Sequence, residues 1–365
     1  MKMIVSGGGT GGHIYPALAI IREVQQRISS VSVLFVGTKT GLESTLIPGQ
    51  GIPFRTIDIE GIDRSSPVKA VRSILKIPAS TLQARRIIRE FQPDVIVGTG
   101  GYVSYPIVAA GASMGIKTCI HEQNAFPGLA NRRLAKKVDL VMVAFPEAIP
   151  HLSAKRVELT GLPVRKEILA LAEQMPLRKE NDHFTLLAFG GSLGAESINR
   201  AMLELVYRYR NYSDIRIIWI TGKGHYESMQ RELLKKLQGQ SLLCELQMIP
   251  YHEHIEKVMG ITDLVICRAG ASTVSELAVL GLPAILIPYP YAAENHQEKN
   301  ARALVEKNAA AMLIDKELDG DTLYKKVESM RLDPDKLHKM SSNMLAQAKP
   351  DALANIADLV LEGLI

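Results

Sequence analysis

Short apolar runs alternate with amphipathic segments along almost the whole chain. Runs rich in β-branched residues, such as VSVLFVG, PDVIVGTGG and VDLVMVAF, end in polar or glycine-rich turns. Between them lie segments with apolar residues at helical spacing, such as PALAIIREVQQRI. Alternation of buried strands and amphipathic helices is typical of parallel sheets covered by helices. The pattern therefore predicts an α/β fold.

The second half of the chain repeats the scheme of the first. The glycine turn that begins at Gly7 recurs at Gly190, and the stretch DVIVGTGG at Asp94 recurs as DLVICRAG at Asp263. A chain of 365 residues is also too long for one ordinary hydrophobic core. We therefore expect two doubly wound, Rossmann-like domains that face each other across a cleft, with ligand loops at the carboxyl ends of their strands.

The boundary between the domains is expected in the stretch LTGLPVRKEI, where Gly161 and Pro163 interrupt the pattern before a new helix. This gives an N-terminal domain over residues 1–163 and a C-terminal domain over residues 164–341. A last helix, predicted over residues 351–364, carries apolar residues on one face. We expect it to pack back onto the first domain.

The composition is typical of a globular protein, and its charge is unevenly distributed. The chain is 47% hydrophobic and 22% charged, and its three cysteines are far apart, which predicts buried thiols in a reducing compartment. No apolar run approaches the ~18 residues of a membrane span, and no signal peptide is expected. The first 163 residues hold 19 Lys and Arg against 11 Asp and Glu, a balance of +8. This excess predicts an anionic partner or surface on the first domain.

The stretch GGGTGGH, residues 7–13, joins a predicted strand to a predicted helix. Glycines at this density let backbone amides approach a phosphate at a helix N-terminus. Gly7, Gly9 and Gly12 match the GxGxxG pattern of dinucleotide folds, but the second strand ends in LFVGTKTG without the acidic residue which that reading needs. A P-loop is excluded, because His13 stands where lysine is required.

Two further stretches resemble hydrolase motifs. GGSLG, residues 190–194, matches the GxSxG elbow of serine hydrolases, with Asp263 and His296 as possible partners of the serine. Gly191 and the complete α/β half that precedes it favour a phosphate-binding loop instead. HEQN, residues 121–124, lacks the second histidine of the HExxH zinc motif, which excludes a zinc protease of that class.

A third kind of ligand explains more of these stretches together. CRAGASTVSE, residues 267–276, reads as a strand end, a small-residue loop and a helix start. Its amides can hold a phosphate, and Glu276 can accept two hydrogen bonds from a vicinal diol such as a ribose. The alternative for Glu276 is a carboxylate that only stabilises the helix N-terminus. His296 and Gln297 add polar groups suited to sugar hydroxyls.

Seven motifs stand here in the order that one family has: GGGTGGH, GTGGYVS, HEQN, GLPVR, GGSLGA, CRAGASTVSE and AAENHQ. Over nearly its full length the chain resembles the MurG family, the N-acetylglucosaminyltransferases that make the lipid-linked disaccharide of peptidoglycan. The resemblance implies a two-domain GT-B glycosyltransferase. The second domain would bind UDP-N-acetylglucosamine (UDP-GlcNAc), and the first would bind lipid I, the lipid-linked muramyl-pentapeptide acceptor. Leu162 and Tyr105 depart from the family pattern, which has asparagine and glycine there.

Matching positions imply a role for each motif. His13 is the candidate general base for the muramyl 4-hydroxyl, and the alternative is a histidine that only hydrogen-bonds the loop. The expected contacts of the acceptor pyrophosphate are Gly8, Gly9, Gly100, Gly101 and Tyr102. The expected donor-binding residues are Thr10, Gly11, Gly12, Asn124, Arg165, Ser192, His252, Ala271, Ser272, Thr273, Val274, Ser275, Glu276, His296 and Gln297.

A basic segment between Arg64 and Arg89 is a candidate membrane surface. It holds seven basic residues without an intervening acidic one, together with apolar residues at roughly helical spacing. We expect reversible contact with the anionic inner leaflet of the cell membrane, and the alternative is a solvated helix packed on the domain core. The residues expected to make this contact are Arg72, Ile74, Leu75, Lys76, Arg85 and Arg86.

The resemblance also indicates where the protein acts and which partners it has. It implies a peripheral protein on the cytoplasmic side of the cell membrane, with other cell-wall synthesis enzymes as further partners and no nucleic acid. The loops carry no paired-aspartate motif, so no metal or other cofactor is expected to be required. Two alternatives stay open: a related glycosyltransferase acting on diacylglycerol, which GGGTGGH and HEQN disfavour, and a non-catalytic nucleotide-sugar-binding module.

Overall fold

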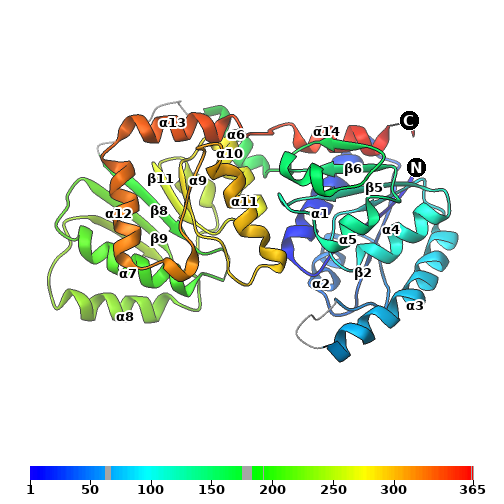
Figure 1. Ribbon diagram of the computed structural model, residues 1–365, viewed down its shortest axis with the longest axis horizontal. Coiled ribbons are helices and arrows are strands. Elements are labelled where there is room, and N and C mark those ends of the chain that lie inside the picture. Colours follow the sequence, from blue (N-terminus) through cyan, green and yellow to red (C-terminus); the bar gives the residue numbers. More distant parts are fainter. Residues whose placement is uncertain (62–66, 175–182, 192, 363, 365) are drawn as a thin grey trace. The chain divides into compact units, whose positions relative to one another are not determined.

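The computed structural model describes residues 1–61, 67–174, 183–191, 193–362 and 364, without the side chains of residues 67–74. The chain forms two compact units. The first consists of Met1–Pro163 with Lys349–Ile365, and the second of Val164–Ala348. Each unit is built on one parallel sheet (Figure 1). The predicted pair of doubly wound α/β domains is confirmed.

The sheet of the first unit has seven strands in the order β3-β2-β1-β4-β5-β6-β7, all parallel. The strands are β1 (Lys2–Ser6), β2 (Ser32–Gly37), β3 (Phe54–Thr56), β4 (Val95–Gly98), β5 (Lys117–Glu122), β6 (Leu140–Val143) and β7 (Val157–Leu159). The helices are α1 (Gly11–Arg27), α2 (Glu43–Leu46), η1 (Pro48–Gln50), α3 (Pro67–Phe91), α4 (Ser104–Ser113), α5 (Leu129–Leu134), η2 (Pro146–His151) and α14 (Ala352–Leu361).

Two hydrophobic clusters lie on the two faces of this sheet, because its strands are apolar on both faces. One cluster joins β1 and β2 to α1 and to the last helix, α14, through the buried side chains of Ile356 and Val360. Arg27 of α1 also forms an ion pair with Asp358 of α14. The chain therefore returns to the first unit at its end.

The sheet of the second unit has six strands in the order β10-β9-β8-β11-β12-β13, all parallel. The strands are β8 (Phe184–Phe189), β9 (Ile215–Ile220), β10 (Glu245–Ile249), β11 (Leu264–Cys267), β12 (Ala284–Leu286) and β13 (Ala311–Met312). The helices are α6 (Lys166–Gln174), α7 (Glu196–Tyr209), α8 (Tyr226–Leu237), α9 (Ile255–Met259), α10 (Ala271–Leu280), η3 (Ala293–Asn295), α11 (His296–Val305), η4 (Asp315–Glu317), α12 (Gly320–Arg331) and α13 (Pro334–Leu345).

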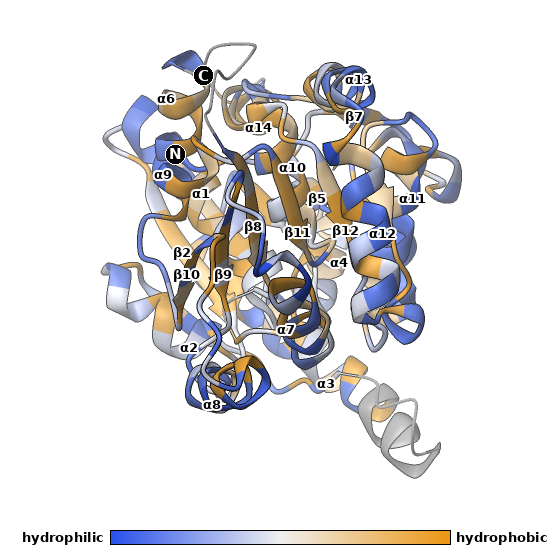
Figure 2. Ribbon diagram, turned by 90° about the vertical axis from the view of Figure 1, so that its left-hand side faces the viewer, coloured by the Kyte–Doolittle hydropathy of each residue, from blue (hydrophilic) through white to orange (hydrophobic). Residues whose placement is uncertain are grey.

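Hydrophobic strands and amphipathic helices build the core of the second unit. Figure 2 shows apolar colours along β8, β9 and β11 and mixed colours on α7 and α12. Trp219 of β9 is fully buried, and its indole N–H donates to Asn199 Oδ1 at 2.9 Å. This unit extends past residue 341, where the sequence predicted its end. Met344 of α13 is buried, and Ser341 donates to the Gly281 carbonyl oxygen at 2.7 Å.

The repeated aspartates have the same structural task in both sheets. Asp94 precedes β4, and its Oδ2 accepts a hydrogen bond from the Lys2 amide of β1 at 2.7 Å. Asp263 precedes β11, and its Oδ2 accepts from the Thr185 amide of β8 at 2.8 Å. Each carboxylate satisfies a backbone donor at the amino end of a neighbouring strand. The repeat therefore marks the edge of each sheet that is opposite its ligand loops.

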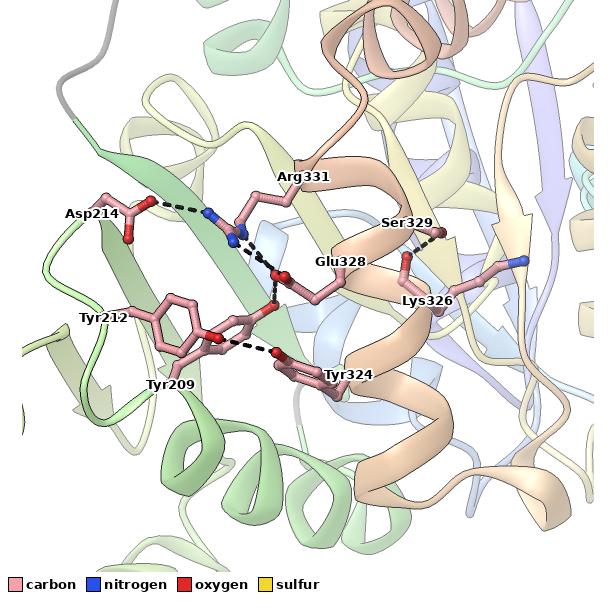
Figure 3. Close-up of polar contacts among 8 residues, drawn as sticks. All are labelled: Tyr209, Tyr212, Asp214, Tyr324, Lys326, Glu328, Ser329 and Arg331. Atoms are coloured by element: carbon pink, nitrogen blue, oxygen red, sulfur yellow. Dashed lines mark hydrogen bonds and ion pairs between the residues drawn. The ribbon is translucent and has the colours of Figure 1, made fainter.

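A polar cluster fastens α12 to the core of the second unit (Figure 3). Glu328 accepts hydrogen bonds from the Tyr209 hydroxyl at 2.7 Å and from Arg331 Nε at 2.6 Å. Arg331 also pairs with Asp214 at 2.9 Å. Burial alone would raise the pKa of Glu328, but the hydrogen bonds of Arg331 and Tyr209 and the charge of Arg331 outweigh it and lower the pKa. Glu328 is therefore ionised in the folded protein at neutral pH.

Replacing Glu328 by alanine should lower the free energy of unfolding by about 3 kcal/mol at pH 7, because Arg331 and the Tyr209 hydroxyl lose their buried partner. Because the pKa of Glu328 in the folded protein lies below its ordinary value of 4.5, the ionised carboxylate stabilises the fold at pH values above 4.5. This stabilisation is lost as the pH falls through the pKa of the folded state. The deficit of Glu328→Ala in thermal unfolding should therefore shrink on acidification below pH 4.5. The control is Glu298→Ala, which removes a more exposed ion pair with Arg302 and should cost about 0.5 kcal/mol.

Candidate active site

The ligand loops of the first unit leave its sheet where the strand order reverses. β1 and β4 are neighbours, with Ser6 opposite Gly98, so the loops that follow them begin side by side. A Cβ atom on Gly101, whose φ is +80°, would lie 2.3 Å from the carbonyl oxygen of Gly8. Two backbones can approach that closely only where the residue is glycine. Gly101 thus packs the two loops together, a task that the sequence interpretation had not assigned to it.

His13 lies in the first turn of α1. Its Nδ1 is 3.0 Å from the Gly8 carbonyl oxygen and 3.2 Å from Thr10 Oγ1. Because a carbonyl oxygen only accepts hydrogen bonds, Nδ1 of the neutral ring carries the proton and Nε2 carries the lone pair. A base that acts through Nε2 needs this tautomer. Gly11 and Gly12 begin the same helix, so their amides belong to the N-terminal donors that have no acceptor within it.

Glu43 lies beneath the glycine loop, and the sequence interpretation missed it. The residue is fully buried, and its carboxylate accepts hydrogen bonds from the Gly9 amide at 3.2 Å and from Thr38 Oγ1 at 2.8 Å. The Thr38 amide donates to the same carboxylate at 3.1 Å. The Gly9 amide is therefore used within the protein. Gly9 was expected to contact the acceptor pyrophosphate, but its amide is directed towards the Glu43 carboxylate instead.

The HEQN stretch ends β5 beside the same loops. His121 is fully buried, and its Nε2 donates to the Gly161 carbonyl oxygen at 2.9 Å. Burial lowers the pKa of His121 to about 4, although the bond to Gly161 opposes the shift. His121 is therefore neutral at pH 7. Its Nδ1 accepts a hydrogen bond from Gln123 Nε2 at 3.1 Å, so its role is structural.

Glu122 organises the loop that follows. Its buried carboxylate accepts hydrogen bonds from the amides of Asn124 and Gly128, each at 3.0 Å, and from Asn131 Nδ2 at 2.8 Å. Burial raises the pKa of Glu122, although these hydrogen bonds oppose the shift. Asn124 Nδ2 lies 3.3 Å from the same carboxylate. The position of the expected sugar contact Asn124 is thus fixed by its neighbour.

The first unit also contains Tyr102 and Gly100, both expected at the pyrophosphate, and the two residues that depart from the family pattern. A Cβ on Gly9 would lie 3.5 Å from Tyr102 Cε1, so this ring lines the glycine loop. Gly100 has a φ of +101°. Leu162 is a buried core residue with 2% exposure, and the Tyr105 ring packs on the core with Lys137 Nζ 5.8 Å from its centroid. Neither side chain is thus exposed as a free polar contact for a ligand.

The second unit also places two ligand loops side by side. β8 and β11 are neighbours, with Phe189 opposite Cys267, so the GGSLG and CRAGAS loops begin together. Ser192 lies outside the described residues. Next to it, Leu193 is 84% exposed, and the Gly194 amide donates to the Gly191 carbonyl oxygen at 3.0 Å in a tight turn.

Arg165 and Glu276 are brought together although 111 positions separate them. Arg165 Nε and Nη2 donate to the two carboxylate oxygens of Glu276 at 2.6 and 3.1 Å. Glu256 is a second carboxylate near this guanidinium, at 3.6 Å from Nη1. A carboxylate has about four acceptor positions and Arg165 uses two, so Glu276 keeps capacity for a diol.

The first two turns of α10 contain the other residues expected at the donor phosphate and ribose: Ala271, Ser272, Thr273, Val274 and Ser275. Gly270 precedes this helix in an extended conformation. His252, whose backbone is expected to read the uracil, accepts a hydrogen bond on Nδ1 from the His254 amide at 3.1 Å. These residues thus occupy a loop and a helix start, where backbone amides are available.

Hydrogen bonds to the backbone fix the two predicted sugar-binding residues of the AAENHQ stretch, His296 and Gln297. Gln297 Oε1 accepts from the Tyr289 amide at 2.9 Å, which directs the Gln297 amide nitrogen away from that contact. His296 Nδ1 is 2.8 Å from the Ala293 carbonyl oxygen and therefore donates to it. Asn295, which precedes α11, adopts a left-handed conformation with a φ of +56°, which asparagine tolerates better than most residues.

The serine hydrolase alternative fails on the position of its acid. Asp263 binds the Thr185 amide at the start of β8, whereas residue 192 follows the end of that strand. A catalytic acid has to reach the histidine that contacts the serine, so it cannot lie at the opposite edge of the sheet. Asp263 is therefore structural.

The part of the predicted membrane segment that the structure describes, residues 67–89, belongs to α3, and neighbouring carboxylates neutralise part of its charge. Lys76 Nζ lies 3.0 Å from Asp58 and 2.6 Å from Glu60. Arg86 pairs with Glu90 at 2.9 Å. The charge of Lys76 is therefore partly neutralised by two carboxylates that precede the segment, which the composition of the segment alone did not indicate.

Two large apolar side chains of α3 are exposed to solvent. Leu75 and Leu82, seven residues apart and hence on one helical face, are 72% and 67% exposed. Arg85 Nη2 donates to Ser113 Oγ at 3.2 Å. The side chains of Arg72 and Ile74 lie outside the described residues. Within the described parts of the chain, no helix has both the length and the apolar composition needed to cross a bilayer.

Models of two known domain families match the two halves of the chain. The glycosyltransferase family 28 N-terminal domain matches residues 3–143. The glycosyltransferase family 28 C-terminal domain matches residues 185–356. Both sets of ligand loops described above lie within these matches.

Relatives match over the full length. A protein of Desulforamulus reducens is 45% identical over 366 residues, covering 99% of this chain and 98% of the relative. A protein of Desulforudis audaxviator is 44% identical over 368 residues with the same coverage. Both are named UDP-N-acetylglucosamine--N-acetylmuramyl-(pentapeptide) pyrophosphoryl-undecaprenol N-acetylglucosamine transferase. The crystal structure of Acinetobacter baumannii MurG is similar with a TM-score of 0.82 and 29% identity, covering 99% of each chain.

Proposed function

Since the chain belongs to glycosyltransferase family 28, we propose that it transfers N-acetylglucosamine from UDP-GlcNAc to the 4-hydroxyl of lipid I and so makes lipid II. The observation that supports this most is the identity of 45% with a transferase of that name over 99% of the chain. The reaction belongs to peptidoglycan synthesis, on which cell-wall growth, cell shape and division depend.

The chemistry is a single displacement. The 4-hydroxyl oxygen of the muramyl residue forms a bond to the anomeric carbon of the donor, and the bond from that carbon to the phosphate oxygen breaks. UDP leaves, and attack from the opposite face converts an α-linked donor into a β-linked product. Nε2 of His13 takes the hydroxyl proton, because Nδ1 is already protonated against the Gly8 carbonyl oxygen.

The leaving diphosphate needs charge stabilisation. In the second unit the helix start at Ala271 supplies hydrogen-bond donors, and Arg165 supplies a positive charge that is shared with Glu276. We assign Glu276 to the ribose hydroxyls and Gln297 to the transferred sugar. In the first unit the loops after β1 and β4 receive the acceptor.

The direct test uses radiolabelled UDP-GlcNAc with a short-chain lipid I analogue. We expect label in the lipid-linked product, with little released by hydrolysis. A parallel reaction with diacylglycerol tests the alternative acceptor. Label that stays on the donor would point to a binding module, and label that reaches only diacylglycerol would contradict the proposed acceptor.

We further propose that α3 places the protein on the cytoplasmic face of the membrane, where lipid I resides. Replacing Leu75 and Leu82 by aspartate together with Arg86→Glu should abolish flotation with anionic vesicles at physiological salt, because both apolar insertion and charge attraction are lost. Arg86 is altered rather than Lys76 because, although it pairs with Glu90, its side chain is 84% exposed, whereas the side chain of Lys76 is 23% exposed between Asp58 and Glu60.

Transfer to a water-soluble, short-chain acceptor should survive in the same triple variant. The matched control is Leu234→Asp, which alters a side chain of α8 that is 65% exposed. That variant should float like the unaltered protein. Undiminished flotation of the triple variant would mean that another surface contacts the membrane.

A further inference from the structure

Among the residues that the structure describes, a buried amide oxygen near His13 has no hydrogen-bond partner. Gln123 is 2% exposed, and its Oε1 makes no hydrogen bond to any described residue. Buried polar atoms in native proteins are nearly always paired, so an unpaired one calls for an explanation such as a ligand. None of the roles assigned above uses this atom.

The orientation of the Gln123 amide is fixed by chemistry. Its nitrogen lies 2.8 Å from the Thr99 carbonyl oxygen, 3.1 Å from the His121 carbonyl oxygen and 3.1 Å from His121 Nδ1. His121 Nδ1 is an acceptor, because the proton of that ring is on Nε2. Exchanging the amide oxygen and nitrogen would turn an acceptor towards three acceptors. Oε1 therefore points away from them.

Oε1 and His13 Nε2 border the same residue, Gly100. A Cβ atom on Gly100 would lie 2.8 Å from His13 Cδ2, 3.1 Å from His13 Nε2 and 3.5 Å from Gln123 Oε1. A side chain at this position would collide with the imidazole, so only glycine lets the two acceptors lie this close to the same backbone. A single attacking hydroxyl has one proton and satisfies only one of the two. The second acceptor needs a second donor on the same ligand.

We propose that Gln123 is a positioning residue for the acceptor sugar, with Oε1 accepting a hydrogen bond from its 6-hydroxyl. This inference rests on the proposed function, in which Nε2 of His13 takes the proton of the 4-hydroxyl. The substituent at carbon 3 of a muramyl residue is an ether and has no donor. The 6-hydroxyl is the donor on the other side of the 4-hydroxyl. Two hydrogen bonds from neighbouring positions would orient the attacking oxygen.

The test is a cycle of acceptor analogues and variants. With the unaltered enzyme, short-chain lipid I analogues carrying 6-deoxy or 6-fluoro groups should lose about 10- to 100-fold in kcat/KM, since neither can donate to the buried oxygen. Gln123→Met should react more slowly with the natural acceptor and should no longer discriminate against the two analogues. The loss caused by the variant and by the analogue would then not be additive.

Asn131→Leu is the matched control. Asn131 is also a buried amide with an unpaired oxygen, and its nitrogen donates to His121 and Glu122. If this variant is slower, it should still show the full penalty for the 6-deoxy acceptor. Equal rates for natural and 6-fluoro acceptors with the unaltered enzyme would overturn the proposal even if Gln123→Met does not fold. So would a 6-deoxy penalty that persists in Gln123→Met. Failure of the proposed function is distinguishable, because then the natural acceptor itself receives no label.

Discussion

Turnover of the His13→Ala variant should fall about 100-fold or more, while KM for UDP-GlcNAc stays nearly unchanged. General-base catalysis acts on the transition state, where the loss of a positioned base typically costs about 10²- to 10⁴-fold. Binding of the donor before the reaction does not depend on that proton transfer, so KM for the donor should not change. The measurement is steady-state transfer to the short-chain acceptor over a range of donor concentrations.

A second variant separates catalysis from loop structure. His13 Nδ1 donates to the Gly8 carbonyl oxygen, so alanine removes a loop contact as well as a base. Asparagine can place an amide N–H near the position of Nδ1 and has no base at the position of Nε2. We therefore expect His13→Asn to be as slow as His13→Ala. Recovery of most of the turnover in His13→Asn would mean that the histidine only holds the loop.

The strands and the ligand loops could be predicted because their signals are local. An apolar run before a glycine cluster predicts a strand and its turn wherever the chain goes afterwards. The repeat at Asp94 and Asp263 predicts a repeated sheet, which the hydrogen bonds to Lys2 and Thr185 explain. Parallel pairing then brings the loops after β1 and β4 together without further information.

Contacts made by side chains distant in sequence had no local signal. Glu43 is an ordinary helix-start carboxylate in the sequence, and only the fold places it under Gly9. Gln123 stood inside a quoted motif, but its unpaired oxygen depends on Thr99 and His121 taking the nitrogen. Neither role could therefore be assigned before the fold was known.

The charge of α3 also depends on residues outside the segment from which it was judged. The basic character of α3 was judged from the residues between Arg64 and Arg89 alone. Asp58 and Glu60 come just before that segment and fold back onto Lys76. Formal charge along a helix therefore overestimates the field that the helix presents, because opposite charges from neighbouring segments cancel part of it.

Donor binding should depend on Glu276. We expect Glu276→Ala to raise KM for UDP-GlcNAc roughly 10- to 150-fold, since hydrogen bonds to a charged group contribute about 1.5–3 kcal/mol. Part of any loss could come from Arg165, whose guanidinium is held by the same carboxylate at 2.6 Å. The variant alone cannot separate these two causes.

A donor that lacks the ribose 2′-hydroxyl separates them. If Glu276 accepts hydrogen bonds from the diol, the unaltered enzyme should discriminate against the 2′-deoxy donor, and Glu276→Ala should lose that discrimination. Glu256→Ala is the matched control, because Glu256 also faces Arg165, at 3.6 Å, and has no expected contact with the ribose. It should keep the discrimination whatever it does to the rate. If Glu276→Ala still prefers the natural donor by the full factor, the ribose is bound elsewhere, and Glu276 serves only to hold Arg165.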